Sequence, residues 1–155
     1  MSEKNVDRGL KAVARVRSAR ETAARQKLQI VNAELQRRQD YLDHLNGQLA
    51  EAPVAIDGTL DDLHAAHAHI DVIRTGIGYA VGEVQLGREL VEIARTEWEG
   101  HNQDLSAVEH LLAKRAERRR KERDRRDARD LDDIASQRWL RGATADPIAI
   151  EGGSL

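Results

Sequence analysis

The clearest pattern in the chain is a series of apolar residues at seven-residue intervals in its second half. The series begins at Leu63 and ends at Leu112. A second series, mostly of small or apolar residues, lies three positions later and runs from Ala66 to Val108. Two such positions per heptad, sustained over this length, are typical of a coiled-coil helix. The pattern therefore predicts one long second helix, over residues 59–138.

The first half carries a matching seam. No proline occurs between Val6 and Glu51, and apolar residues recur there in alternating steps of three and four. Arg38 occupies the one seam position that is not apolar. We expect a first helix over residues 1–51. Its apolar seam residues are Leu28, Val31, Leu35, Leu42, Leu45 and Leu49.

A short break, residues 52–58, separates the two patterns. Pro53 ends the first helix, and Gly58 permits a left-handed turn. Thr59 can then cap the second helix, with Asp61 and Asp62 in its first turn. The expected fold is all-α: two long helices form an antiparallel coiled-coil hairpin, and the second helix is longer and overhangs the first.

The two seams also predict a register. If the a positions of one helix face the d positions of the other in antiparallel register, the numbers of facing residues add up to about 115. Gly87 then faces Leu28, and Trp98 faces Arg17. Large residues meet small ones in several layers, as close packing requires.

In this register Met1 lies opposite Lys114, so residues 114–138 have no partner within the chain. This overhang would be about 35 Å long, and an isolated helix of that length is marginal in water. It is therefore either frayed or ordered by a partner. We expect residues 139–155 to form a disordered tail.

Composition supports a coiled coil and argues against a globular core. Charged residues make up 34 % of the chain and aromatic residues 3 %, and there is no Phe. The chain has no Cys, which fits a reducing cytoplasm. Its N-terminus lacks the apolar stretch of a signal peptide, and no run of apolar residues is long enough for a transmembrane helix.

Candidate chemistry is sparse. There is no phosphate-binding loop, no cysteine nucleophile and no expected pocket in a two-helix hairpin. We therefore expect no enzyme activity and no cofactor. A metal could be held by one polar stripe, although a solvated helix face is the favoured interpretation. That stripe consists of Asp61, His64, His67 and Asp71.

The most charged stretch is residues 114–130, with ten basic and five acidic residues. A nucleic-acid-binding arm is one interpretation. The alternating signs allow pairs within the helix, and the stretch has no aromatic residue for base stacking. A charged helix held in a protein groove is favoured, and no nucleic-acid partner is expected.

The order of features resembles the FliJ family of flagellar type III export proteins. It starts with an Arg/Ala/Val-rich opening helix at residues 10–17 and a Pro/Gly-bearing loop near one third of the length. A longer second helix follows, with a Trp in its middle and then an Arg/Glu-rich stretch. The ending, Leu-Asp-Asp-Ile-Ala-Ser-Gln-Arg at residues 131–138, looks like the closing signature of that family.

The resemblance implies a cytoplasmic protein, peripheral at the membrane, that functions in flagellum assembly and motility and resembles the coiled coil of the ATP synthase γ subunit. Its implied partners are the hexameric export ATPase, the membrane export gate and export chaperones. The implied ATPase contacts are Arg115, Arg118, Arg119, Arg126, Asp132, Asp133, Ile134 and Arg138. The implied gate or chaperone contacts are Tyr41, Leu42, Leu45 and His67.

Another interpretation stays open. A generic coiled-coil scaffold or dimerisation module would show the same heptads and would use the overhang for self-association. A concentration-dependent dimer that dissociates on truncation after Leu112 would favour it.

Overall fold

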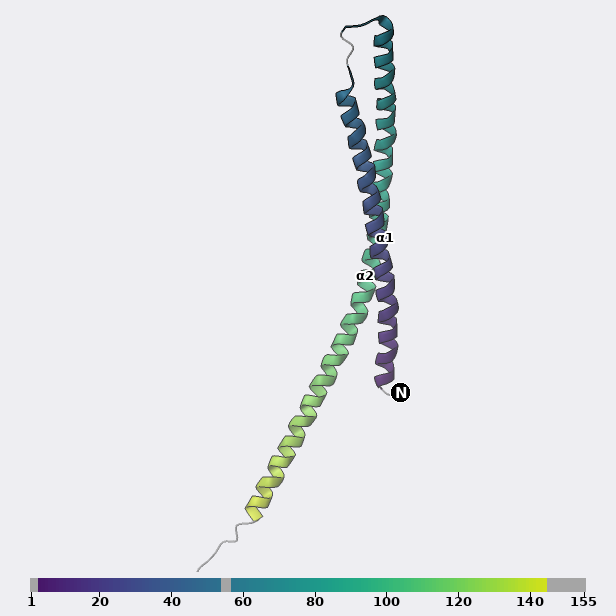
Figure 1. The fold of residues 1–155 in the computed structure, drawn as a ribbon. Coiled ribbons are helices and arrows are strands. Elements are labelled where there is room, and N and C mark those ends of the chain that lie inside the picture. The colour runs from purple at the N-terminus through teal and green to yellow at the C-terminus, as the bar shows by residue number, and fades with distance from the viewer. Residues whose placement is uncertain (1–2, 54–56, 145–155) are drawn as a thin grey trace, which may run out of the picture. The chain divides into compact units, whose positions relative to one another are not determined.

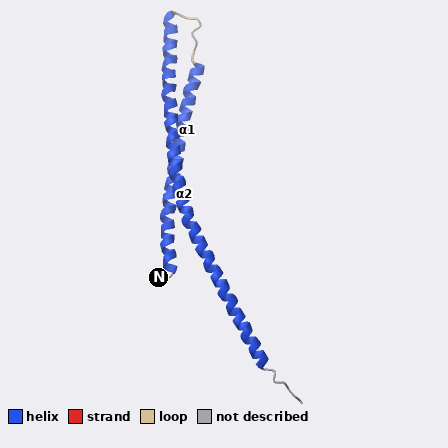
Figure 2. Cartoon of the chain, turned by 180° about the vertical axis from the view of Figure 1, so that it is seen from behind, coloured by secondary structure: helices blue, strands red, loops and turns tan. Residues whose placement is uncertain are grey.

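The fold consists of two long helices. The computed structural model describes residues 3–53 and 57–144 (Figure 1), and no strand occurs among them. Helix α1 spans Glu3–Glu51, and helix α2 spans Leu60–Thr144 (Figure 2). The prediction of an all-α hairpin with a longer second helix is confirmed.

The expected end of the second helix was wrong. Helix α2 continues past residue 138 and through Gly142 to Thr144. A single glycine lowers the stability of a helix by only about 1 kcal/mol relative to Ala, so it does not by itself end a helix. The Thr144 hydroxyl also donates a hydrogen bond to the Leu140 carbonyl, at 3.0 Å. The rest of the expected tail, residues 145–155, lies outside the described residues.

The start of α2 is capped as predicted. The Thr59 hydroxyl accepts a hydrogen bond from the Asp62 backbone N–H at 3.3 Å, and the Thr59 N–H donates to the Asp62 carboxylate at 2.9 Å. These reciprocal bonds form a capping box. Gly58 is not in the left-handed region, contrary to expectation. Glycine instead leaves room for the Asp62 side chain, because a Cβ at position 58 would lie 3.1 Å from the Asp62 carboxylate.

The chain forms two units, Met1–Val108 and Glu109–Leu155. In the first, α1 and the N-terminal part of α2 pack along the predicted seam (Figure 1). The buried apolar residues of this hairpin all occupy heptad positions, so burial follows the sequence pattern. They are Ala24, Leu45, Ile73, Ala80, Val84, Val91, Ala94 and Val108.

The predicted register was wrong by one heptad. Gly87 lies against Leu35, whose Cδ1 would be 3.0 Å from an added Cβ, and not against Leu28. Trp98 donates its indole N–H to Glu21 at 2.8 Å, so it does not face Arg17.

Polar contacts between the helices form in the observed register. A shift of seven residues leaves every seam position in the seam, so apolar periodicity alone cannot fix it. In the observed register Lys27 pairs with Glu97, and Arg17 donates to the Asp104 carbonyl at 2.8 Å. Arg38, the polar residue of the α1 seam, donates to the Glu83 carbonyl at 3.1 Å.

Candidate functional site

The second unit presents an exposed helical surface. Every described side chain from 120 to 144 is exposed to solvent. A helix without packing of an amphipathic face has little tertiary stabilisation. Residues 120–144 are therefore available to a partner along their whole length.

Charges in this unit are segregated by sign around α2. With 100° per residue, eight basic residues and only Glu122 among the acidic ones fall on one half of the helix between 114 and 130. The other half carries four acidic and two basic residues, so the net charges are +7 and −2. The basic face consists of Lys114, Arg115, Arg118, Arg119, Lys121, Arg125, Arg126 and Arg129.

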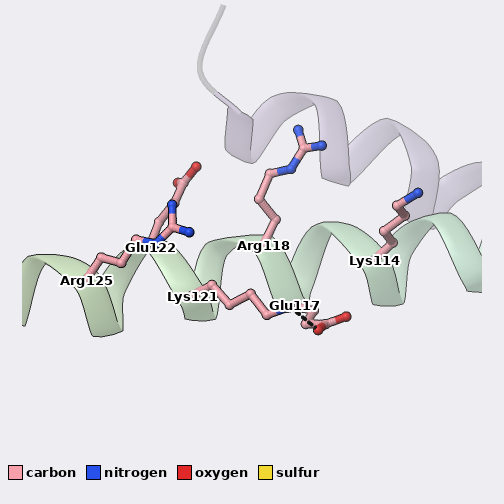
Figure 3. Close-up of a pocket in the computed structure, with 6 residues that line it drawn as sticks. All are labelled: Lys114, Glu117, Arg118, Lys121, Glu122 and Arg125. Carbon is pink, nitrogen blue, oxygen red and sulfur yellow. Dashed lines mark ion pairs between the residues drawn. The ribbon is translucent and has the colours of Figure 1, made fainter.

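This segregation changes the interpretation drawn from the sequence. The signs alternate along the chain, but helical geometry brings like charges together. An ion pair at the border, between Lys121 and Glu117 at 2.7 Å, holds the pKa of Glu117 below its ordinary value through a hydrogen bond. Figure 3 shows Lys114 and Arg118 extending away from that pair. A helical projection of the sequence could have found the basic face.

The predicted ATPase contacts lie in this unit, on different sides of the helix. Arg118 and Arg126 are exposed on the basic face, whereas Arg115 and Arg119 are half-buried and have interaction partners. In the closing signature, Ile134 and Arg138 share a side of α2 with Leu131. Asp132 and Asp133 are exposed on other sides of the same turns.

Apolar side chains near the end of α2 were missed by the sequence reasoning. Leu131 is 68 % exposed and Trp139 is 72 % exposed, and Leu140 is also exposed. A tryptophan in a strongly polar stretch of the helix was the available signal, because large apolar groups on a charged surface often mark contacts. Together with Ile134, these residues form the C-terminal apolar group.

The predicted gate or chaperone contacts are not gathered in one place. Leu45 is buried against Gly76, with a Cδ1 distance of 3.6 Å to an added Cβ, and Leu42 is half-buried. These two leucines therefore hold the hairpin together. Tyr41 and His67 are exposed, but in the observed register His67 lies beyond the end of α1 and far along α2 from Tyr41.

A different apolar surface occurs on the hairpin. Val72, Tyr79, Leu86 and Ile93 follow at seven-residue steps, so they share one side of α2, and all are exposed. Leu90 lies between the last two on the same side.

Exposed residues of α1 join this surface. The Lys27–Glu97 ion pair crosses between the helices on that side, four residues after Ile93. Ile30 is three residues after Lys27, and Tyr41 is two heptads after it. We call this surface the lateral face. It comprises Val13, Val16, Ile30, Tyr41, Val72, Tyr79, Leu86, Leu90 and Ile93.

Most of the exposed large apolar side chains of the hairpin lie on the lateral face. Among the residues between 7 and 108 that the structure describes, it holds nine of the twelve exposed large apolar side chains. The other three, Leu60, Leu63 and Val81, lie elsewhere on α2. A surface rich in apolar side chains on one side of a hairpin is a candidate for binding a partner.

Neither a metal-binding cluster nor a membrane-spanning helix is found in the described part of the chain. No group of three or more His, Asp or Glu side chains there could hold a metal ion, and the stripe at residues 61–71 does not form one. Among the same residues, no helix is both long and apolar enough to span a bilayer.

Comparison with known families decides the kind of protein. The family described as Flagellar FliJ protein matches residues 7–144, which cover α2 and nearly all of α1. The chain belongs to the FliJ family. The resemblance noted in the sequence is thus confirmed, and FliJ membership places the chain among components of flagellar protein export. Comparisons with curated proteins and with solved structures gave no match.

Proposed function

We propose that this FliJ-family chain binds the hexameric export ATPase through residues 109–144 and couples it to the export gate and chaperones. The basic face of α2 carries this proposal. A net charge of +7 on one half of the helix, where six of the eight basic side chains are exposed, suits an acidic groove, because complementary potentials steer and orient association. The protein acts in the cytoplasm and reaches the membrane through its partners.

The C-terminal apolar group adds binding free energy that the charges of the basic face alone do not provide. Leu131, Ile134 and Trp139 are exposed on the same segment as the basic face. Large apolar and aromatic side chains provide most of the binding free energy of protein interfaces, whereas rim charges contribute mainly to association rate. We infer that the ATPase contact combines both groups.

The lateral face is the better candidate for the gate or chaperone contact. It keeps Tyr41 from the predicted set and replaces the half-buried Leu42 and the buried Leu45 with exposed residues of α2. A two-helix surface of this kind suits an amphipathic helix from a partner, which lays its apolar side on the hairpin.

ATP hydrolysis by the cognate export ATPase tests the proposal. The full-length chain should stimulate hydrolysis or ring assembly, and a chain truncated after Leu112 should not. If neither affects the ATPase while both stay helical, the chain is instead a coiled-coil scaffold.

A matched charge reversal localises the contact. Arg118→Glu with Arg125→Glu reverses two charges on the basic face, and Arg120→Glu with Arg123→Glu reverses two on the other half. Both double variants change the net charge equally. We expect the first to weaken ATPase binding at least tenfold and to reduce its salt dependence. Equal weakening by both would contradict a role for the basic face.

A further inference from the structure

The seam of the hairpin fits a second register. In that register α1 is displaced by one heptad, about 10 Å, toward the loop. Val31 would face Val84 instead of Val91, and Leu28 would face Gly87. Apolar residues again meet apolar or small ones, because both helices repeat the same heptad positions.

The chain connection permits both registers. In the observed one, the end of α1 at Glu51 lies level with residues near 71, while α2 begins at Leu60. This offset is about 16 Å along the axis, and the eight connecting residues can span about 28 Å. Displacement toward the loop shortens the distance to be spanned. It also brings Leu49 against Ala66, which has no α1 residue opposite it in the observed register.

The ion pair on the lateral face would be exchanged, not lost. Arg20 is one heptad before Lys27, so in the second register it takes the place of Lys27 beside Glu97. Arg38, by contrast, would move away from Glu83. That pair is partly exposed, and ion pairs of this kind contribute little to stability.

One cluster distinguishes the registers strongly. The Glu21 side chain is only 8 % exposed, and its two carboxylate oxygens accept hydrogen bonds from Trp98 at 2.8 Å and from Arg25 at 2.9 Å. Displacement by one heptad would leave Glu21 opposite Ala94. A buried carboxylate that loses a donor is costly, so this cluster holds the observed register.

We propose that the hairpin is a two-register device, held in the observed register by the Glu21–Trp98 hydrogen bond and able to slide by one heptad. Discrete steps of one packed element past another are an established means of transmitting displacement. The slide would carry α1 along α2 without unfolding either helix. This property belongs to the hairpin alone and holds whichever partners the chain has.

Cysteine cross-linking tests the proposal, because the native chain has no Cys. Three double variants of the full chain share Val31→Cys. Val91→Cys reports the observed register, Val84→Cys reports the second, and Ile77→Cys fits neither and reports random opening. Intramolecular cross-linking rates are compared in the native background and with Trp98→Phe, which removes the indole N–H. Glu34→Ala serves as a control background, since Glu34 pairs only with Arg37 and Arg38 of its own helix.

The expected order of rates is Val91, then Val84, then Ile77. Trp98→Phe should raise the Val84 rate about tenfold relative to Ile77, the factor that corresponds to losing one hydrogen bond to a charged group. Glu34→Ala should leave the ratio unchanged. A Val84 rate equal to the Ile77 rate in both the native and Trp98→Phe backgrounds would overturn the proposal. So would a rise shared equally by all three pairs, which reports general loosening.

Discussion

At the scale of single residues, a few polar groups determine what the apolar pattern leaves open. Glu21 occupies a buried position in a seam that is otherwise mostly apolar, and it is satisfied by one donor from each helix. A buried carboxylate tolerates only the register that supplies its donors. Thr59 and Asp62 act in a similar way at the start of α2, where they fix its first residue.

Trp98→Phe should destabilise the hairpin by about 1–3 kcal/mol, because Glu21 stays buried and loses the indole donor. Urea unfolding followed by circular dichroism measures this change. Trp139→Phe is the matched control. Trp139 is 72 % exposed, so the same substitution there should change stability by less than about 0.5 kcal/mol. Equal effects would mean that the hydrogen bond to Glu21 contributes nothing.

The capping box should depend on pH. Hydrogen bonds from the Thr59 backbone N–H and hydroxyl lower the pKa of Asp62 from its ordinary value of 3.8. A lowered pKa in the folded state stabilises folding above the ordinary value, and this contribution is lost as the pH falls from about 4 through the lowered pKa. The start of α2 should therefore fray in acid.

An NMR titration of the Asp62 carboxyl checks this prediction. In Thr59→Ala its pKa should rise toward 3.8 but stay below it, because the backbone N–H of residue 59 still donates. A native Asp62 pKa at or above 3.8 would show that the capping box does not form in solution.

At the scale of the element, α2 carries glycines that the heptad pattern does not require. A Cβ at Gly82 would meet nothing within 4 Å, whereas one at Gly87 would lie 3.0 Å from Leu35. Gly87 therefore serves packing between the helices. Gly82 has no such role, and nothing in the structure explains it.

Paired substitutions separate these two glycines. Gly82→Ala should raise the free energy of unfolding by about 0.5–1 kcal/mol, through reduced freedom of the unfolded chain and better helix propensity. Gly87→Ala should gain less or lose stability, because Leu35 must move. Thermal unfolding of both variants measures the difference. A larger gain for Gly87→Ala would contradict the observed register at this layer.

At the scale of the whole molecule, two units carry two kinds of surface. The hairpin holds the apolar lateral face, and the second unit holds the basic face and the C-terminal apolar group. Their chemistry differs, so the two surfaces suit two different kinds of partner, as the proposed function requires. Each surface can then be disabled without touching the other.

Leu86→Asp should weaken binding of a gate or chaperone partner at least tenfold, because it places a charge in the centre of the lateral face. Val81→Asp is the matched control, since Val81 is 52 % exposed but lies outside that face. Isothermal titration with the purified partner domain measures both. Neither variant should alter stimulation of the ATPase. Similar weakening by both substitutions would show that the lateral face is not the contact.

The sequence alone determined the two helices, their antiparallel seam, the Thr59 cap and membership of the FliJ family, because heptads and caps are local patterns. Only the tertiary structure decided the register, since a shift of one heptad preserves the pattern and is settled by contacts such as Trp98 with Glu21. It also brought Tyr41 of α1 onto the same side of the hairpin as Tyr79 and Leu86 of α2, because that placement depends on how the two helices pack against each other.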